Sequence, residues 1–135
     1  MAPFLLQFDG GARSGTKASG AGAVLYDPFG VELDHRSVFL APCTNNTAEY
    51  EALITGLDMA RAWKVRELAV QGDSKLVIEQ VTGKFRVNFP HLRALKARVL
   101  ELMEGFDTIS FEHIPRAKNT RADALANEAM DKICL

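Results

Sequence analysis

The sequence predicts an α/β fold in which helices cover the faces of a β-sheet. Strand patterns fill the first 40 residues, and from residue 47 onward helical and strand patterns alternate. Such alternation is typical of parallel strand pairing, because each helix carries the chain back over the sheet to the start of the next strand. With 135 residues and 47% hydrophobic content, the chain can bury one sizeable core. We therefore expect a single domain over residues 1–135.

The first three strands come without an intervening helix. Residues 4–9 alternate weakly and run into Gly10-Gly11, which we interpret as a strand followed by a tight turn. Residues 21–26 and 31–40 also have strand character. The segment 27–30, Asp-Pro-Phe-Gly, has proline and glycine where turns favour them. We therefore expect a hairpin there.

The rest of the chain alternates between helices and strands. The patterns predict, in order, a helix, a strand, two helices, a strand and a final helix, over residues 47–63, 67–71, 74–81, 90–106, 108–114 and 119–132. Within 90–106, Leu92, Leu95 and Val99 have the spacing of one face of an amphipathic helix. Pro115 ends the last strand.

The composition excludes several classes of protein. No apolar run approaches the roughly 20 residues that span a bilayer, and residues 1–9 lack the basic and apolar regions of a secretion signal. We expect a cytoplasmic protein without membrane contact, and we take it to be a monomer. Cys43 and Cys134 lack the neighbours that a zinc site or disulfide scaffold would have, so free thiols are expected, although the sequence leaves open whether they pair.

A formal net charge of −1 argues mildly against nucleic-acid binding, because such proteins usually carry a basic excess. Two local basic clusters offset this. They are Lys84, Arg86, His91, Arg93, Lys96 and Arg98, and Arg116, Lys118 and Arg121. Two divalent cations held by acidic residues would add four charges and take the formal charge from −1 to +3. A phosphate-bearing substrate is therefore not excluded.

Four acidic residues are the candidates for a catalytic site, and each has a structural explanation when taken alone. Asp9 can open the predicted turn after residue 9. Glu49 follows Asn46 by three residues, which matches a capping arrangement. Asp73 can cap a helix that follows a strand. Asp123 can complement the dipole at the start of the last helix.

Taken together, the four acids predict a metal site. Asp9 and Asp73 each follow a glutamine by two residues at the carboxyl end of a predicted strand, so parallel neighbours would bring them together. Glu49 and Asp123 fall in first turns of helices, and α/β sheets bind ligands beyond their strand carboxyl ends. Four acids there would repel one another unless cations lay between them. Oxygen-only ligands select Mg²⁺ or Mn²⁺, and two such ions about 4 Å apart can promote phosphodiester hydrolysis.

Four segments that contain these acids resemble, in order, the signature blocks of type 1 ribonuclease H, and the similarity covers essentially the whole chain. They are FDGGAR (8–13), NNTAEYEAL (45–53), GDS (72–74) and PRAKNTRADALA (115–126). The resemblance implies a ribonuclease H-like fold with a five-stranded mixed sheet, three antiparallel strands followed by parallel strands, and helices on both faces. It also implies an endonuclease that uses two Mg²⁺ or Mn²⁺ ions to hydrolyse the RNA strand of RNA/DNA hybrids, leaving 3′-hydroxyl and 5′-phosphate ends.

The same resemblance implies roles for individual residues. Asp9 and Asp123 would bind the ion that activates water, and Asp9, Glu49 and Asp73 would bind the second ion. The 2′-hydroxyls that distinguish RNA from DNA would contact Glu49, Asn45 and the backbone of Gly10, Gly11 and Ala12. A phosphate of the DNA strand would bind at Thr44 and Asn88.

The sequence departs from many family members at two places. Residues 82–90 are short where a basic protrusion rich in Lys and Trp is common, so we expect weaker substrate affinity or binding through Arg93, Lys96 and Arg98. The loop 115–119 has no histidine to help protonate or release product, which resembles an archaeal and plant-like subgroup. Arg116 or Lys118 would take that role, and His113 lies just upstream, although a strand residue with a satisfied hydrogen bond is the simpler interpretation of His113.

Two other functions stay open. One is a domain of the same fold that binds nucleic acid but has lost catalysis, against which the presence of all four acids argues. The other is a nuclease that acts on DNA, against which the glycines after Asp9 and the pair Asn45-Asn46 argue. Activity on double-stranded RNA is also left open by the sequence.

Overall fold

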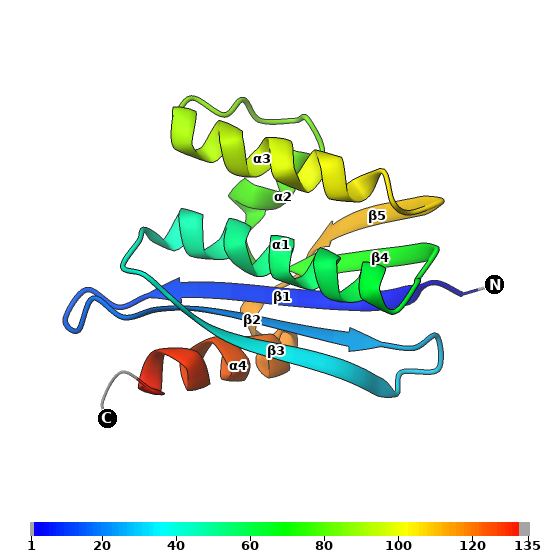
Figure 1. Ribbon diagram of the computed structural model, residues 1–135, viewed down its shortest axis with the longest axis horizontal. Helices are drawn as coiled ribbons and strands as arrows, with labels where there is room; N and C mark the ends of the chain where they lie inside the picture. Colours follow the sequence, from blue (N-terminus) through cyan, green and yellow to red (C-terminus); the bar gives the residue numbers. More distant parts are fainter. Residues whose placement is uncertain (1, 133–135) are drawn as a thin grey trace.

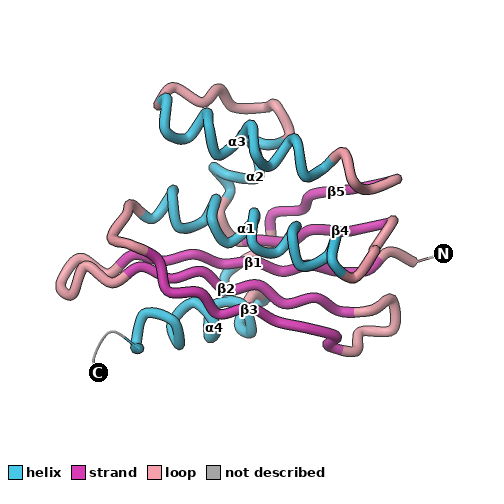
Figure 2. Tube along the Cα trace, in the orientation of Figure 1, coloured by secondary structure: helices cyan, strands magenta, loops and turns pink. Residues whose placement is uncertain are grey.

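The computed structural model describes residues 2–132 of the chain, as five strands, four α-helices and one short 3₁₀ helix (Figure 1). In chain order these are β1 (Phe4–Ala12), β2 (Ser19–Tyr26), β3 (Glu32–Leu40), α1 (Asn45–Ala62), β4 (Glu67–Gly72), α2 (Lys75–Val81), α3 (Pro90–Met103), β5 (Thr108–His113), η1 (Arg116–Lys118) and α4 (Thr120–Asp131). Figure 2 shows the strands gathered in one layer, with α1, α2 and α3 on one side and α4 on the other.

The five strands form one mixed sheet in the order β3-β2-β1-β4-β5. β1 pairs with β2, and β2 with β3, in antiparallel register, whereas β1–β4 and β4–β5 are parallel. Gln7 lies opposite Gln71, and its Nε2 donates to Gln71 Oε1 at 2.9 Å. The expected α/β fold with a mixed sheet is confirmed.

β2 is buried on both faces, which explains its small and apolar sequence, SGAGAVLY. Ala23 and Leu25 belong to the main core beneath α1, whereas Val24 packs with Ala122 and Leu125 of α4 on the opposite face. The stripe predicted for residues 90–106 is also confirmed, because Leu92 and Val99 are buried in the main core and Leu95 packs against it.

The prediction of a turn at Gly10-Gly11 is wrong, because β1 continues to Ala12. Gly10 lies where α1 approaches the strand most closely, and a Cβ there would overlap the backbone of Ala48 and Glu49. The glycine therefore serves close packing rather than a change of direction. The chain reverses later, where the backbone N–H of Arg13 donates to Ala18 O at 2.8 Å.

Two helix starts also differ from expectation. α1 is capped by Thr44, whose hydroxyl accepts from Thr47 N at 3.2 Å, so Asn46 lies inside the helix and caps nothing. α2 is capped by Ser74, which accepts from Val77 N at 3.3 Å. Neither Glu49 nor Asp73 is therefore engaged in capping, and both side chains are available for another role.

Within residues 2–132, no helix combines the length and apolar character that crossing a bilayer would need. Cys43 forms no disulfide with a described residue, and Cys134 lies outside the described part of the chain.

We expect Gly22→Ala to destabilise the protein by about 1 to 3 kcal/mol, because an added methyl group would push α4 off the sheet. A Cβ at Gly22 would lie 2.6 Å from Ala126 N and closer still to Ala122 O. Urea unfolding would measure the change. Gly15→Ala is the matched control, since no heavy atom lies within 4 Å of a Cβ there. Equal stability of the two variants would contradict this account of the packing.

Candidate active site

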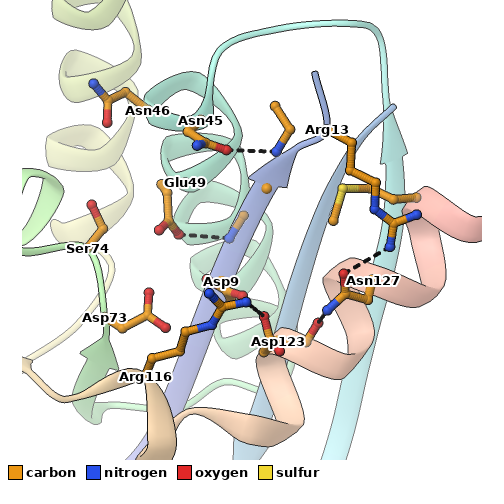
Figure 3. Close-up of a pocket in the computed structure, with 14 residues that line it drawn as sticks. Asp9, Arg13, Asn45, Asn46, Glu49, Asp73, Ser74, Arg116, Asp123 and Asn127 are labelled. Carbon is orange, nitrogen blue, oxygen red and sulfur yellow. Dashed lines mark hydrogen bonds and ion pairs between the residues drawn. The ribbon is translucent and has the colours of Figure 1, made fainter. Parts of the chain in front are cut away.

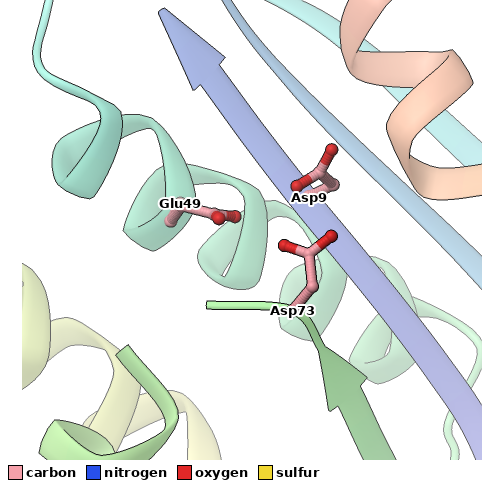
Figure 4. A group of neighbouring side chains, drawn as sticks. All are labelled: Asp9, Glu49 and Asp73. Atoms are coloured by element: carbon pink, nitrogen blue, oxygen red, sulfur yellow. The ribbon is translucent and has the colours of Figure 1, made fainter. Parts of the chain in front are cut away.

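Three carboxylates from three different elements converge at one edge of the sheet. Asp9 lies on β1, Glu49 on α1, and Asp73 directly after β4. The parallel β1–β4 ladder ends at the pair Phe8 and Gly72, so the two aspartates are the next residues of adjacent strands. One ligand oxygen from each of the three side chains lies within 4.8 Å of the others (Figure 4). The predicted convergence of Asp9 with Asp73 is therefore what the parallel register produces.

Asp123, in the first turn of α4, faces the same pocket but is not a member of this group of three. Its Oδ1 lies 3.5 Å from a terminal guanidinium nitrogen of Arg116. The Arg116 side chain is 79% exposed, and Figure 3 shows it reaching across the pocket toward Asp123. Asp123 thus has an exposed, positively charged partner, whereas Asp9, Glu49 and Asp73 form no salt bridge with any described residue.

The acids line an open pocket of about 350 Å³. Its walls contain all four carboxylates and most of the other residues that the sequence had suggested, namely Gly10, Gly11, Ala12, Asn45 and Arg116. The structure thus brings together segments that are up to 114 residues apart between Asp9 and Asp123. Serine, asparagine and arginine side chains around the acids make the pocket polar and suited to a charged ligand.

Four predicted substrate residues lie outside this pocket: Thr44, Asn88, Arg93 and Lys118. The Thr44 hydroxyl is engaged at the start of α1, beside a cavity of about 470 Å³ that His91 also lines. Arg93 Nε donates to Val87 O at 2.9 Å. Asn88 is exposed on the loop before α3, and Lys118 is exposed at the end of η1. These residues would contact only a ligand that extends well beyond the acids.

Beyond the end of β4, two side chains of α1 accept hydrogen bonds from backbone N–H groups of β1 that have no partner strand. The backbone N–H of Gly10 donates to Glu49 Oε1 at 2.7 Å, and that of Ala12 donates to Asn45 Oδ1 at 2.8 Å. Strand amides without a partner strand need such acceptors. These bonds fix Glu49 and Asn45 in place and leave the second oxygen of Glu49 and the Nδ2 of Asn45 for a ligand.

The electrostatics of the pocket oppose full ionisation of the acids. Burial, followed by the nearby charges of Glu49 and Asp73, raises the pKa of Asp9 to about 9. Burial also raises the pKa of Glu49 to about 8, although the hydrogen bond from Gly10 N–H acts in the opposite direction. Both groups would hold a proton at neutral pH unless positive charge entered the pocket. Clustered acid oxygens with raised pKa values and no nitrogen or sulfur donor fit a hard divalent cation.

Sequence reasoning missed Asn119, which is fully buried. Its Nδ2 donates to Phe8 O at 2.9 Å and lies 3.4 Å from Asp73 Oδ2. An asparagine just before a helix is the usual N-cap signature, so its position suggested nothing further. His113 also contacts this region, since its Nε2 lies 3.3 Å from Asp73 O, a strand-end hydrogen bond of the kind expected for it.

Comparisons with known proteins agree with this geometry. The sequence profile of a family described as "Reverse transcriptase-like" matches residues 7–129. A ribonuclease HI of Halobacterium salinarum is 43% identical over 124 residues, which are 92% of this chain. The chain spans 62% of the length of that relative.

Two solved structures are similar over nearly all of both chains. The ribonuclease H1 of H. salinarum gives a TM-score of 0.91 at 40% identity, with 96% of this chain and 98% of that one covered. A ribonuclease H1 isolated from compost, solved in complex with an RNA/DNA hybrid, gives 0.90 at 36% identity, with 98% and 99% covered.

We expect Asp9→Asn to stabilise the metal-free protein by an amount on the order of 1 to 3 kcal/mol at pH 8. The folded protein binds protons at Asp9 that the unfolded chain releases above its ordinary pKa of 3.8. The parent therefore loses stability as the pH rises from about 4 toward 9, and the asparagine does not.

Thermal unfolding in EDTA at several pH values would test this prediction. Glu128→Gln, an exposed acid on α4, is the control and should show no gain that grows with pH. A lower stability of Asp9→Asn at pH 8, or a difference independent of pH, would contradict the electrostatic account.

Proposed function

The chain belongs to the ribonuclease H1 family, and on that basis we propose that it hydrolyses the RNA strand of RNA/DNA hybrids as a metal-dependent endonuclease that leaves 3′-hydroxyl and 5′-phosphate ends. The observation that carries this proposal is the group formed by Asp9, Glu49 and Asp73, with Asp123 in the same pocket. A relative with the same fold has been solved with an RNA/DNA hybrid bound, which supports the choice of substrate.

The four carboxylates would hold two Mg²⁺ ions, or Mn²⁺ in their place. Such a pair of ions lowers the pKa of water and stabilises charge on the attacking and leaving oxygens of a phosphodiester. Asp9 lies between Asp73 and Asp123 in Figure 3, and the charges of both act on it, so it would be shared by both ions. Glu49 would offer Oε2, since its Oε1 accepts from Gly10 N–H.

Arg116 is the residue that would take the place of the absent loop histidine. It lines the pocket and lies beside Asp123, whereas Lys118 does not line the pocket and His113 contacts the backbone of Asp73. A guanidinium stays charged at all physiological pH values, so it cannot donate a proton in the manner of histidine. Its role would therefore be to attract and stabilise phosphate charge as the product leaves.

Recognition of RNA would come from the wall of the pocket formed by β1 and α1. The free Nδ2 of Asn45 and the polar backbone of Gly10 to Ala12 lie beside the acids, where they can contact 2′-hydroxyls next to the cleaved bond. Those hydroxyls are absent from DNA, so these contacts would select the RNA strand for cleavage.

A basic groove offers a second contact for the hybrid. The loop before α3 and α3 itself line a cavity of about 560 Å³ with the positive side chains of Lys84, Arg86, Arg93 and Lys96. Arg98, which the sequence placed in the same set, instead lies 3.7 Å from Asp58 and 3.5 Å from Glu101. Lys84 is also paired, since its Nζ lies 3.7 Å from Glu79 Oε2. We therefore assign binding of the nucleic-acid backbone to Arg86, Arg93 and Lys96.

We expect Asp73→Asn to lower cleavage of a labelled hybrid by a factor on the order of 100 or more, with the fold retained, because one of the clustered acids is lost. Incubation with Mg²⁺ or Mn²⁺, with EDTA as the blank, would measure this on RNA/DNA, RNA/RNA and DNA/DNA duplexes. Asp58→Asn, an exposed acid elsewhere on α1, should cleave as the parent does.

An intact RNA strand in the parent reaction would overturn the proposed activity. Binding of the hybrid without cleavage in either metal would favour a domain that has lost catalysis. Cleavage of duplex DNA with the hybrid spared would favour the DNA-acting alternative.

We expect Lys96→Gln to weaken hybrid binding and to reduce the salt dependence of binding by about one unit in slope, because one phosphate contact is lost. The turnover rate at saturating substrate should not change. Fluorescence anisotropy in EDTA over a range of salt concentrations would measure the slope. Arg66→Ala removes a charge that pairs with Asp107 away from the groove, and it should leave the slope unchanged.

A further inference from the structure

We propose that Asn119 is a positioning residue that fixes the carboxylate of Asp73 and ties it to the strand and helix that carry Asp9 and Asp123. This inference rests on the proposed function, because its purpose is to shape the site for cation binding. Asn119 touches neither solvent nor the expected position of the substrate, since its side chain is fully buried.

Asn119 is hydrogen-bonded to all three segments. Its Nδ2 donates to the carbonyl of Phe8, the neighbour of Asp9, at 2.9 Å, and it also lies 3.4 Å from Asp73 Oδ2. Its backbone carbonyl accepts from Asp123 N at 3.0 Å. One residue is therefore bonded to the segments that carry three of the four acids, and the fourth, Glu49, is held separately by Gly10 N–H.

The way in which Asn119 uses its side chain argues against a role in starting α4. It occupies the N-cap position, yet its side chain makes no capping hydrogen bond. Its Oδ1 is buried without a hydrogen-bond partner among the described residues. An asparagine that stabilised the helix would direct this oxygen at the first amides of the helix. Here the amide nitrogen is directed at the acidic site, and the carbonyl oxygen goes unsatisfied in consequence.

A single donor on one oxygen of Asp73 has a clear physical effect. Asp73 is only half-buried and follows the end of a strand, so its side chain has other rotamers available. The contact with Asn119 favours the rotamer that faces Asp9 and leaves Oδ1 free for a cation. Partners of this kind orient metal ligands, and their removal typically weakens metal affinity or activity by about 10- to 100-fold.

Titration of the full chain with Mn²⁺ by calorimetry, without substrate, would test the proposal. We expect Asn119→Ala to raise the Kd for Mn²⁺ by about 10-fold or more. Ser37→Ala is the matched control, because it removes another hydrogen bond that anchors α4, from Ser37 Oγ to Leu125 O at 2.7 Å, away from the acids. Its Kd for Mn²⁺ should equal that of the parent.

A double-mutant cycle shows whether Asn119 acts through Asp73. In an Asp73→Asn background, Asn119→Ala should change the Kd for Mn²⁺ by less than in the parent background, since the carboxylate that it positions is gone. In cleavage assays of Asn119→Ala, the Mg²⁺ concentration for half-maximal kcat should rise while KM for the hybrid stays constant.

An unchanged Kd for Mn²⁺ in Asn119→Ala, or equal effects in both backgrounds, would overturn the proposal. Asn119→Ser, which leaves a smaller polar side chain, serves if the alanine variant does not fold, and failure of both to fold would assign Asn119 to stability alone. A parent protein that binds Mn²⁺ but cleaves no hybrid would overturn the proposed function and leave the role of Asn119 standing. Absence of Mn²⁺ binding by the parent would overturn both.

Discussion

The site depends on where the parallel pairing of β1 with β4 stops. The ladder ends at Phe8 and Gly72, while β1 continues to Ala12 along β2. This difference in length leaves β1 with an unpaired edge and places Asp9 and Asp73 side by side at the point where the strands part. Side chains of α1 then accept hydrogen bonds from the unpaired N–H groups of that edge. The gathering of acids is thus a result of strand lengths, and no specialised loop is needed to produce it.

Much of this arrangement could be predicted from the sequence, because the periodic patterns are strong. Each expected strand and helix is present, and the parallel pairing that would bring Asp9 and Asp73 together is confirmed, with Gln7 opposite Gln71. What could not be predicted depends on contacts between distant residues. A glycine that opens a turn and a glycine that admits a helix, such as Gly10, look the same in a sequence. Thr44 and Asn46 are both good capping residues, and only the structure decides between them.

The same limit applies to the candidate site. Asp73 and Asp123 could be found because they lie directly after β4 and in the first turn of α4, where the sequence pattern itself marks a boundary. Asp9 and Glu49 were found from an expected turn and an expected first helical turn, although β1 continues to Ala12 and the first turn of α1 holds no acidic residue. Asn119 could not be found, because its importance comes from the carbonyl of Phe8 across the sheet. Of the two acidic partners of Arg98, Glu101 lies three residues along the same helix, whereas Asp58 belongs to α1 and could not be identified from the sequence. A sequence shows which charged residues are present, but it does not show which of them already form an ion pair in the folded protein.

Two independent requirements hold a glutamate at position 49. Its side chain faces the acidic pocket, and it also accepts the amide of Gly10, which has no partner strand at that point. Neither Asp73 nor Asp123 accepts a hydrogen bond from an unpaired strand amide. In a descendant without catalytic activity, substitutions at positions 73 and 123 would therefore be tolerated. An apolar residue in place of Glu49 would still lower stability, because the backbone N–H of Gly10 would be left without an acceptor. Inactive descendants of this fold should accordingly keep glutamate or glutamine here long after Asp73 and Asp123 have been lost.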